Sequence, residues 1–365
     1  MEAAQRGAPV WALGLMTGTS MDGLDAAWLK TDGERARSAG PAISVDMPDD
    51  LRADLVALAA GRGDAAAVEA AYTAWVAEGA RAALTAGAAQ GLKAAVVGFH
   101  GQTLLHAPAR GRPGEGRSWQ LGDGPALARS LGVPVVYEFR AADVAAGGEG
   151  APFASLFHDA ITADQPRPLA LLNLGGVGNV TYLAKDAPPL AFDTGPANAP
   201  CDDLVRARTG AACDRDGALA LAGRADAARI ASWLRDPYFA AEPPKSLDRE
   251  TFAKLDFDGL SLEDAAATAM GFAAASVAKA CDHLPAAPKR WLLCGGGRKN
   301  PALVAALRAA LAAPVDPVEA IGWDGDAIEA YAFAHLAVRS LQGRPLSLPT
   351  TTGVPTPMAG GVLAA

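Results

Sequence analysis

This sequence of 365 residues lacks the marks of several large classes of protein. Its four cysteines include no C-x-x-C pair, and four cysteines in so long a chain do not indicate a disulfide framework. No stretch of 18 apolar residues is free of Gly, Pro and charge, so we expect no membrane span. The first residues also lack the apolar core and cleavage site of a signal peptide. These absences favour a cytoplasmic protein without a membrane partner.

Basic residues are also scarce. Lys and Arg number 32 against 40 Asp and Glu, which gives a formal net charge of −8. An acidic surface argues against a nucleic-acid partner, although an anionic small molecule needs only a few local amides and cations. The five histidines form no metal-binding cluster in the sequence, and the Walker A, G-x-G-x-x-G and G-x-S-x-G patterns are absent.

Glycine, in contrast, is abundant, with 40 residues in a chain that is 50% apolar. These glycines follow no period, which excludes a collagen-like chain. In a globular protein, glycine collects where the backbone turns sharply or approaches another group closely. The length predicts about two domains.

The main clue to the organisation is a repeated unit of strand, glycine-containing turn and strand. The first unit has strands at Val10–Met16 and Leu24–Lys30, and the second spans Leu169–Leu183 with its turn at Gly175–Asn179. Helices and strands follow each unit, so the pattern predicts a duplicated α/β domain. We place the boundary near Asp164–Pro168, with one domain over residues 1–165 plus about 335–365 and the other over 166–334.

Hydrophobic spacing predicts the remaining elements. Helices are expected at Ala65–Leu84, Ser261–Leu284, from about Pro301, and at Ala327–Gln342. Further strands are expected at Ala94–Phe99, Gly132–Arg140, Leu190–Phe192 and Arg290–Cys294. The tail after Pro345 is rich in Pro, Thr and Gly, and we expect irregular structure there.

Three glycine clusters are candidates for contact with a phosphorylated ligand. The turn at Gly18–Gly23 exposes successive amides that suit an anion, and its Asp22 could hold Mg²⁺. In the second turn, glycines leave no Cβ in the way of a ligand. A third cluster, at Gly295–Gly297, lies between a strand and a helix, which suits a base or ribose. The alternative for each is an ordinary turn or connector.

Other polar residues are candidates for catalysis or substrate binding. Asp193 follows a strand and suits a general base, or else organises a D-T-G-P turn. Glu329 could be a second carboxylate, or simply a favoured acidic residue at a helix start. His100 follows a strand, and Arg140 lies in a loop rich in Gly, Arg and Asp, which suits either an anionic substrate or surface ion pairs.

These segments together resemble a known family. GLMTGTSMDGLDAA, FHGQT, EFRAADVAAGGEGAP, NLGGVGNVTYL, FDTGPAN, PPKS, CGGGRKNP, AIEAYAFAHLA and LSLPTTTGV resemble, in order, the motifs of the anhydro-N-acetylmuramic acid kinases, from about Leu13 to Gly353. The resemblance implies two ribonuclease-H-like (actin-like ATPase) domains with ATP in an interdomain cleft. It also implies hydrolysis of the 1,6-anhydro bond coupled to 6-phosphorylation during peptidoglycan recycling, with ATP and Mg²⁺ as cofactors. A homodimer is the assembly that the resemblance suggests.

The resemblance also assigns site residues. It makes Asp193 the catalytic base and places Glu329 near the sugar. The ATP loop falls on Gly18, Thr19, Ser20, Met21, Asp22, Gly23, Leu24 and Asp25. The remaining nucleotide-binding positions are Gly175, Gly176, Gly178, Asn179, Gly295, Gly296 and Gly297. The sugar-binding positions are His100, Gln102, Thr103, Arg140 and Asn198.

Four positions depart from the family's usual pattern, and two other functions remain open. Glu138 stands where Asp is usual, Glu149 where Gln is usual, and Leu247-Asp248 where Thr-Gly is usual. The first alternative function is a kinase of another hexose or amino sugar without the hydrolytic step. The second is a non-enzymatic ATP-binding regulator or assembly protein.

Overall fold

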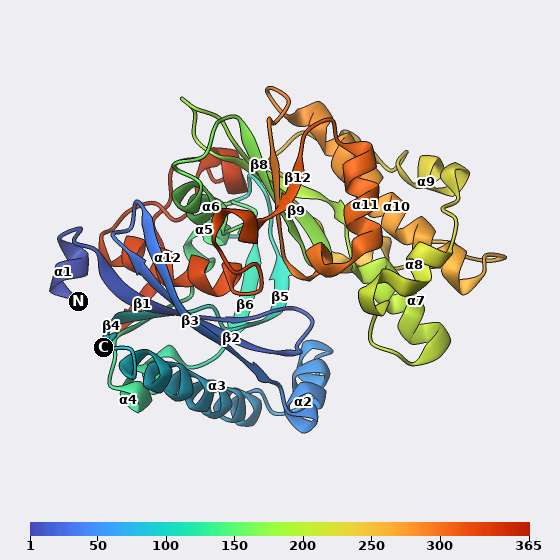
Figure 1. Cartoon of the computed structure of the whole chain (residues 1–365). Helices are drawn as coiled ribbons and strands as arrows, with labels where there is room; N and C mark the ends of the chain where they lie inside the picture. The colour runs from blue at the N-terminus through green and yellow to red at the C-terminus, as the bar shows by residue number, and fades with distance from the viewer. The chain divides into compact units, whose positions relative to one another are not determined.

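Two mixed β-sheets with the same strand order organise the chain (Figure 1). The computed structural model describes all 365 residues, and they divide into two units. The first unit comprises Met1–Asp164 and Ala327–Ala365, and the second comprises Gln165–Asp326.

The sheet of the first unit has the order β13-β7-β4-β1-β2-β3. Its strands are β1 (Val10–Thr17), β2 (Gly23–Thr31), β3 (Ala36–Asp46), β4 (Ala94–Phe99), β7 (Val135–Tyr137) and β13 (Val362–Ala364). β1, β2 and β3 pair antiparallel, whereas β4 and β7 continue the sheet parallel to β1. The short β13 pairs antiparallel with β7 at the edge of the sheet.

Helices cover both faces of this sheet. α3 (Ala65–Ala88) packs through Tyr72 and Val76 against the face that carries Leu13 and Leu15. α12 (Ile328–Leu341) lies on the opposite face, where Gly14 meets it (Figure 1). The remaining elements of this unit are α1 (Glu2–Gln5), α2 (Asp49–Ala59), the hairpin β5 (Gln102–Ala107) and β6 (Arg117–Leu121), α4 (Gly124–Leu131), α5 (Ala141–Ala145), α6 (Ser155–Ile161) and α13 (Pro349–Thr352).

The sheet of the second unit has the order β10-β9-β8-β11-β12. Its strands are β8 (Leu169–Leu174), β9 (Val177–Leu183), β10 (Leu190–Pro196), β11 (Trp291–Cys294) and β12 (Val315–Pro317). β8, β9 and β10 pair antiparallel, and β11 and β12 run parallel to β8. When the strands of each sheet are counted in chain order, both sheets have the strand order 3-2-1-4-5, and the first sheet adds β13 beyond its fifth strand. This is the ribonuclease-H-like arrangement, and the predicted duplicated α/β fold is confirmed.

The long helix of the second unit is α10 (Leu262–Ala280). Ser261 caps its start by accepting a hydrogen bond from the Asp264 amide. Small residues such as Ala266, Ala269 and Ala273 let α10 pack closely in the core of this unit. The other helices are α7 (Ala199–Thr209), α8 (Ala218–Ala222), α9 (Ala227–Trp233) and α11 (Pro301–Ala310), and the 3-10 turns are η1 (Arg215–Gly217), η2 (Pro237–Ala240), η3 (Arg249–Phe252), η4 (Cys281–His283), η5 (Gly296–Lys299) and η6 (Val318–Ile321).

Several predicted boundaries are wrong. The strand expected at Gly132–Arg140 is only β7, because Gly132 ends α4 in the left-handed conformation with φ of 65°. The strand expected to stop at Phe192 continues to Pro196, so it includes Asp193. The tail after Pro345, expected to be irregular, contains α13 and β13. None of the helices is both long and apolar enough to span a membrane.

Candidate active site

The loop between β1 and β2 contains the first glycine turn. Thr19, Ser20 and Asp22 are exposed, and the Ser20 hydroxyl donates to a carboxylate oxygen of Asp22 at 2.8 Å. The Met21 amide donates to the Gly18 carbonyl, and Met21 has a φ of 53°. The predicted ATP loop is therefore a tight turn with exposed polar groups, but its last three positions, Gly23, Leu24 and Asp25, belong to β2. There the Leu24 side chain is buried in the core, and the Asp25 carboxylate accepts from the Ser44 hydroxyl.

Asp22 was the one position predicted to bind a metal. The chain contains no group of three His, Cys, Asp or Glu residues arranged to hold a metal ion. Magnesium in nucleotide sites takes only one or two protein carboxylates, with phosphate oxygens and water completing its shell. A single exposed carboxylate beside a turn predicted to bind phosphate fits that mode of binding. Asp22 would hold the ion only together with the nucleotide.

The second glycine turn joins β8 to β9, and it is shorter than predicted. The turn comprises Gly175 and Gly176, whereas Gly178 and Asn179 lie in β9. The Gly175 carbonyl accepts a hydrogen bond from the Asn198 amide. The Gly176 carbonyl accepts from the amides of Ala197 and Ala199. These contacts fix the turn against the segment that leads into α7.

The predicted nucleotide-binding glycines fall into two groups. Added Cβ atoms at Gly175 and Gly176 would come no closer than 3.5 Å to any atom, and one at Gly296 would meet nothing within 4 Å. The fold itself therefore tolerates a side chain at these positions. A Cβ at Gly178 would lie 2.8 Å from the Thr194 hydroxyl, and one at Gly295 would lie 2.3 Å from an Asn173 oxygen. At Gly178 and Gly295, therefore, packing alone requires glycine.

Gly297 and Asn198 contact the same part of the fold. A Cβ at Gly297 would lie 2.7 Å from the Leu174 Cβ and 2.9 Å from the Asn198 amide oxygen. The Asn198 amide nitrogen donates to the Leu174 carbonyl at 3.1 Å. Asn198, predicted to bind the sugar, therefore packs among the predicted nucleotide-binding glycines of the second unit.

Asp193 lies inside β10 and is 7% exposed. It is directly opposite Asn179 of β9 in the antiparallel register, so both side chains lie on the same face of the sheet. The Leu247 amide donates to the Asp193 Oδ2 at 2.8 Å, and the Asp193 amide donates to the Lys245 carbonyl at 2.9 Å. The second unit therefore holds a buried, oriented carboxylate on β10, opposite the residue of β9 that lies three positions after Gly176.

The segment that contacts Asp193 contains a buried lysine. Lys245 is 6% exposed, and its Nζ donates to the Tyr238 carbonyl at 2.8 Å. The ammonium group lies over the Tyr238 ring at 4.6 Å and near the Phe192 ring at 5.9 Å. Burial lowers the pKa of Lys245 to about 8. The Tyr238 hydroxyl in turn donates to the Asp193 carbonyl at 2.6 Å.

Arg249 is a polar neighbour of the turn that the sequence did not single out for this role. Its Nε would lie 3.7 Å from a Cβ added at Gly176. The guanidinium is held by Asp203 at 2.7 Å and Glu250 at 3.1 Å, and these bonds raise the pKa of Arg249 despite its partial burial. Its position beside the turn has no local signal in the sequence.

The departure at Leu247-Asp248 has a clear structural context. The Leu247 side chain packs on the aromatic cluster of Phe239, Phe252 and Phe272. The Asp248 carboxylate accepts from the Glu250 amide and caps η3. The bond from Leu247 to the Asp193 carboxylate uses only the backbone amide of residue 247, so the substitution leaves it in place.

In the first unit, His100 and Gln102 follow β4 and are almost completely buried. Arg140 Nε donates to His100 Nε2 at 3.0 Å. Burial and the Arg140 charge lower the pKa of His100 well below its ordinary value, so the ring is neutral with its proton on Nδ1. That Nδ1 and the Gln102 Oε1 are buried without a partner in the structure. They offer a hydrogen-bond donor and an acceptor to a ligand.

Gln102 also links this cluster to the first glycine turn. Its amide nitrogen donates to the Gly18 carbonyl at 3.1 Å. Thr103 is half-buried, and its hydroxyl accepts from Gln120 at 3.4 Å. Four of the five predicted sugar-binding residues thus lie in one region of the first unit, bordering its predicted ATP loop: His100, Gln102, Thr103 and Arg140.

The loop after Arg140 is tied to the C-terminal segment. The Arg140 guanidinium donates to the Gly150 carbonyl, and the buried Asp143 accepts from the hydroxyls of Ser347 and Thr352. The unusual Glu149 is also buried, and its amide donates to the Thr352 carbonyl at 2.6 Å. The motifs EFRAADVAAGGEGAP and LSLPTTTGV, which are far apart in the sequence, therefore hold each other in place.

Glu329 lies in the first turn of α12 and is half-buried. It belongs to the first unit, whereas Asp193 belongs to the second. The candidate site residues therefore form two groups, one in each unit.

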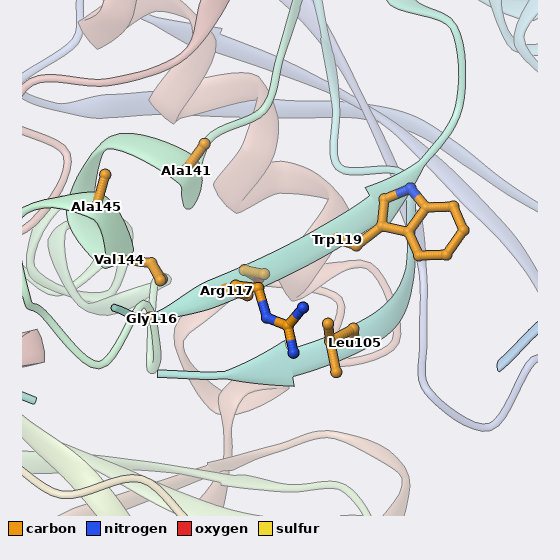
Figure 2. Close-up of a pocket in the computed structure, with 8 residues that line it drawn as sticks. Leu105, Gly116, Arg117, Trp119, Ala141, Val144 and Ala145 are labelled. Carbon is orange, nitrogen blue, oxygen red and sulfur yellow. The ribbon is translucent and has the colours of Figure 1, made fainter. Parts of the chain in front are cut away.

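A pocket of about 400 Å³ lies in the first unit between the β5–β6 hairpin and α5 (Figure 2). Figure 2 shows Leu105 and Trp119 on the hairpin side and Val144 on the helix side. None of the predicted site residues lines this pocket.

The duplicated fold, its glycine turns and its buried carboxylate are the features that the sequence analysis expects of a sugar kinase. The family model for anhydro-N-acetylmuramic acid kinase matches residues 10–365. An anhydro-N-acetylmuramic acid kinase of Paramagnetospirillum magneticum is 51% identical over 353 residues, which cover 96% of this chain and 98% of that protein. One of Rhodospirillum rubrum is 52% identical over 364 residues, with coverages of 99% and 96%. The chain belongs to the anhydro-N-acetylmuramic acid kinase family, as its motifs predicted.

Solved structures give a more distant match. The ADPNP-bound activator of the 2-hydroxyisocaproyl-CoA dehydratase from Clostridium difficile aligns over 91% of this chain and 96% of its own. Its TM-score is 0.47 at 11% sequence identity.

Proposed function

We propose that this kinase couples two reactions on one sugar: hydrolytic opening of the 1,6-anhydro ring of anhydro-N-acetylmuramic acid, and phosphorylation of the released 6-hydroxyl. The product is N-acetylmuramic acid 6-phosphate, and the role is recycling of peptidoglycan in the cytoplasm. The family membership supports the substrate. The observation that carries the coupled reaction is the buried, hydrogen-bonded carboxylate of Asp193 near the glycine turn.

Asp193 acts as the general base in this proposal. Its carboxylate takes a proton from water while the water oxygen bonds to the anomeric carbon of the sugar. The bond between that carbon and the 6-oxygen breaks, and its electron pair stays on the 6-oxygen. This oxygen then attacks the γ-phosphorus of ATP, and ADP leaves. One base thereby serves both steps, because the proton lost by water makes the 6-oxygen nucleophilic.

The glycine turns hold the nucleotide in this proposal. Backbone amides at Gly18–Gly23 and Gly175–Gly176 donate to phosphate oxygens, and the Arg249 guanidinium adds a positive charge beside Gly176. Asp22 would hold Mg²⁺, which supplies charge neutralisation on the phosphates when bound. Backbone amides explain how a chain with a net charge of −8 binds an anionic nucleotide.

The polar cluster of the first unit binds the sugar in this proposal. The unpartnered Nδ1–H of His100 donates to a sugar oxygen, and the Oε1 of Gln102 accepts from a sugar hydroxyl or amide. Because His100 is neutral, it binds without adding charge near the nucleotide. Glu329 assists the water or the departing oxygen.

Labelled water tests the hydrolytic step. In ¹⁸O-water, mass spectrometry of the product should find one ¹⁸O atom on the anomeric carbon and none in the phosphoryl group. Because the anomeric hydroxyl exchanges slowly with water by ring opening, the label is measured at early times beside a reference of unlabelled product in the same water. A phosphorylated product without early label would identify a kinase that lacks the hydrolytic step.

A small side chain at Gly176 tests the proposed phosphate turn. The change Gly176→Ala should leave the thermal unfolding midpoint unchanged, because the added Cβ meets no atom closer than 3.5 Å. It should raise KM for ATP about tenfold or more, the equivalent of about 1.4 kcal/mol of binding, by keeping phosphate from the backbone. Gly178→Ala is the matched comparison, since its Cβ would clash with Thr194 and lower stability. An unchanged KM in a stably folded Gly176→Ala protein would remove this turn from the nucleotide site.

A further inference from the structure

We propose that Lys245 and Tyr238 form a latch that positions the Asp193 carboxylate, so that both are positioning residues for the reaction. This inference rests on the proposed role of Asp193 as the base. Its basis is a closed ring of contacts among three residues that are separate in the sequence.

The first part of the ring joins Asp193 to the segment after Pro244. The Asp193 amide donates to the Lys245 carbonyl at 2.9 Å, and the Leu247 amide donates to the Asp193 Oδ2 at 2.8 Å. The second bond is directional and charge-assisted, so it fixes the rotation of the carboxylate. The orientation of the base therefore depends on where the backbone of residues 245–247 lies.

The second part of the ring holds that backbone in place. Lys245 Nζ donates to the Tyr238 carbonyl at 2.8 Å and lies over the Tyr238 ring. The Tyr238 hydroxyl returns to β10 by donating to the Asp193 carbonyl at 2.6 Å. Removing either side chain opens the ring, and residues 245–247 then lose part of their support against Asp193.

Packing alone does not explain a lysine at this position. Burying an ammonium group costs more than burying an apolar chain of similar length, and the contacts of Lys245 offset this cost only in part, since its pKa is lowered. An apolar residue would fill the space beside Phe192 and Tyr238 at a lower free-energy cost of burial. The ammonium group supplies what an apolar residue lacks, a directed bond to the Tyr238 carbonyl.

The charge of Lys245 gives the latch a measurable pH dependence. The groups that the structure places against Lys245 are Tyr238 of η2, the backbone of Asp193 on β10, and Glu242 on its own segment, which acts on its charge. Of these, Glu242 favours the charged lysine, but burial is the larger effect and lowers its pKa to about 8. As the pH rises through about 8, the ammonium loses its proton, its attraction to the Tyr238 carbonyl and ring weakens, and kcat should fall.

The variants Lys245→Met, Lys245→Arg and Tyr238→Phe test the latch, with Lys254→Met, an exposed lysine of the same unit, as the control. Lys245→Met should lower kcat at pH 7 by about tenfold, leave both KM values within about twofold, and abolish the fall of kcat above pH 8. Lys245→Arg should keep more of kcat and move that fall to higher pH. Tyr238→Phe should lower kcat by a smaller factor, because it removes one bond and keeps the ring. Lys254→Met should match the wild type throughout.

A second measurement, amide hydrogen exchange, tests the latch without an activity assay. Amide hydrogen exchange at Leu247 should be faster in Lys245→Met and Tyr238→Phe than in the wild type, while exchange in the core of β8 stays unchanged. Wild-type kcat and pH profile in Lys245→Met, or unchanged Leu247 exchange in both variants, would overturn the latch. Should Lys245→Met fail to fold, Tyr238→Phe and Lys245→Arg decide the question by the same readouts.

The controls separate this inference from the proposed function. An Asp193→Asn protein with full activity would remove Asp193 as the base, whatever the lysine variants do. An inactive Asp193→Asn protein beside a wild-type-like Lys245→Met protein would overturn the latch alone.

Discussion

Asp193→Asn should lower kcat by about 10²- to 10⁴-fold, the usual contribution of a positioned general base. Asn has nearly the same shape as Asp, and its amide oxygen still accepts the Leu247 amide, so the local structure is retained. What is lost is the ability to take a proton from water. KM for ATP and for the sugar should change little, because the base acts in the transition state rather than in ground-state binding.

The measurement is the initial rate of ADP release with saturating sugar, together with a thermal unfolding curve for each protein. Asp186→Asn is a matched control, since Asp186 lies exposed between β9 and β10 in the same unit. Both variants should unfold at the wild-type temperature, and only Asp193→Asn should lose activity. A fully active Asp193→Asn enzyme would contradict the mechanism proposed above.

The sequence predicted the fold through the positions of its glycine turns. Each turn follows a buried apolar strand and precedes another, and this pattern depends on local residues alone. The turn at Gly18–Gly23 and the turn near Gly175 therefore identified the first two strands of both sheets. The parallel strands β4 and β11 were also predicted closely, because each is a short apolar run that ends at a polar or glycine-rich segment.

The course of β10 could not be predicted in the same way. Asp, Gly and Pro are rare in strands, so the residues after Phe192 indicate a turn. β10 is the edge strand of its sheet, where Pro196 is tolerated because one side of the strand needs no partner from the sheet. The Lys245 carbonyl accepts the Asp193 amide on that side. A tertiary contact from more than 50 residues away therefore sets the backbone of the proposed base.

The candidate site shows the same division between local and tertiary information. Asp193, His100 and the glycine turns have local signals, since each comes directly after a short apolar run in the sequence. Lys245 and Arg249 have none beyond their charges, because their positions depend on how the segment from Pro243 crosses the edge of β10. The grouping of Asn198 with Gly297 likewise follows from packing on Leu174, which no spacing in the sequence encodes.

Gly14→Ala should have the largest effect on stability of any single change considered for this chain. Gly14 lies in β1 where α12 crosses the sheet, and an added Cβ would lie 1.7 Å from the Ala330 carbonyl oxygen and 2.7 Å from the Ala334 amide nitrogen. These are backbone atoms in the middle of a buried helix, so no side-chain rotation relieves the clash. Overpacking a core usually costs 1–3 kcal/mol, and we expect a loss of more than about 3 kcal/mol here because the helix itself must move.

Urea unfolding of the purified protein measures this loss, and Gly176→Ala serves as the control because its Cβ is accommodated. Gly98→Ala should behave like Gly14→Ala, since its Cβ would lie 2.1 Å from the Phe333 carbonyl oxygen of the same helix. Glu329 precedes Ala330 on α12, so any Gly14→Ala protein that still folds should also have a lower kcat. A Gly14→Ala protein with wild-type stability would show that α12 is free to move away from β1, and the position of Glu329 would then not depend on this contact.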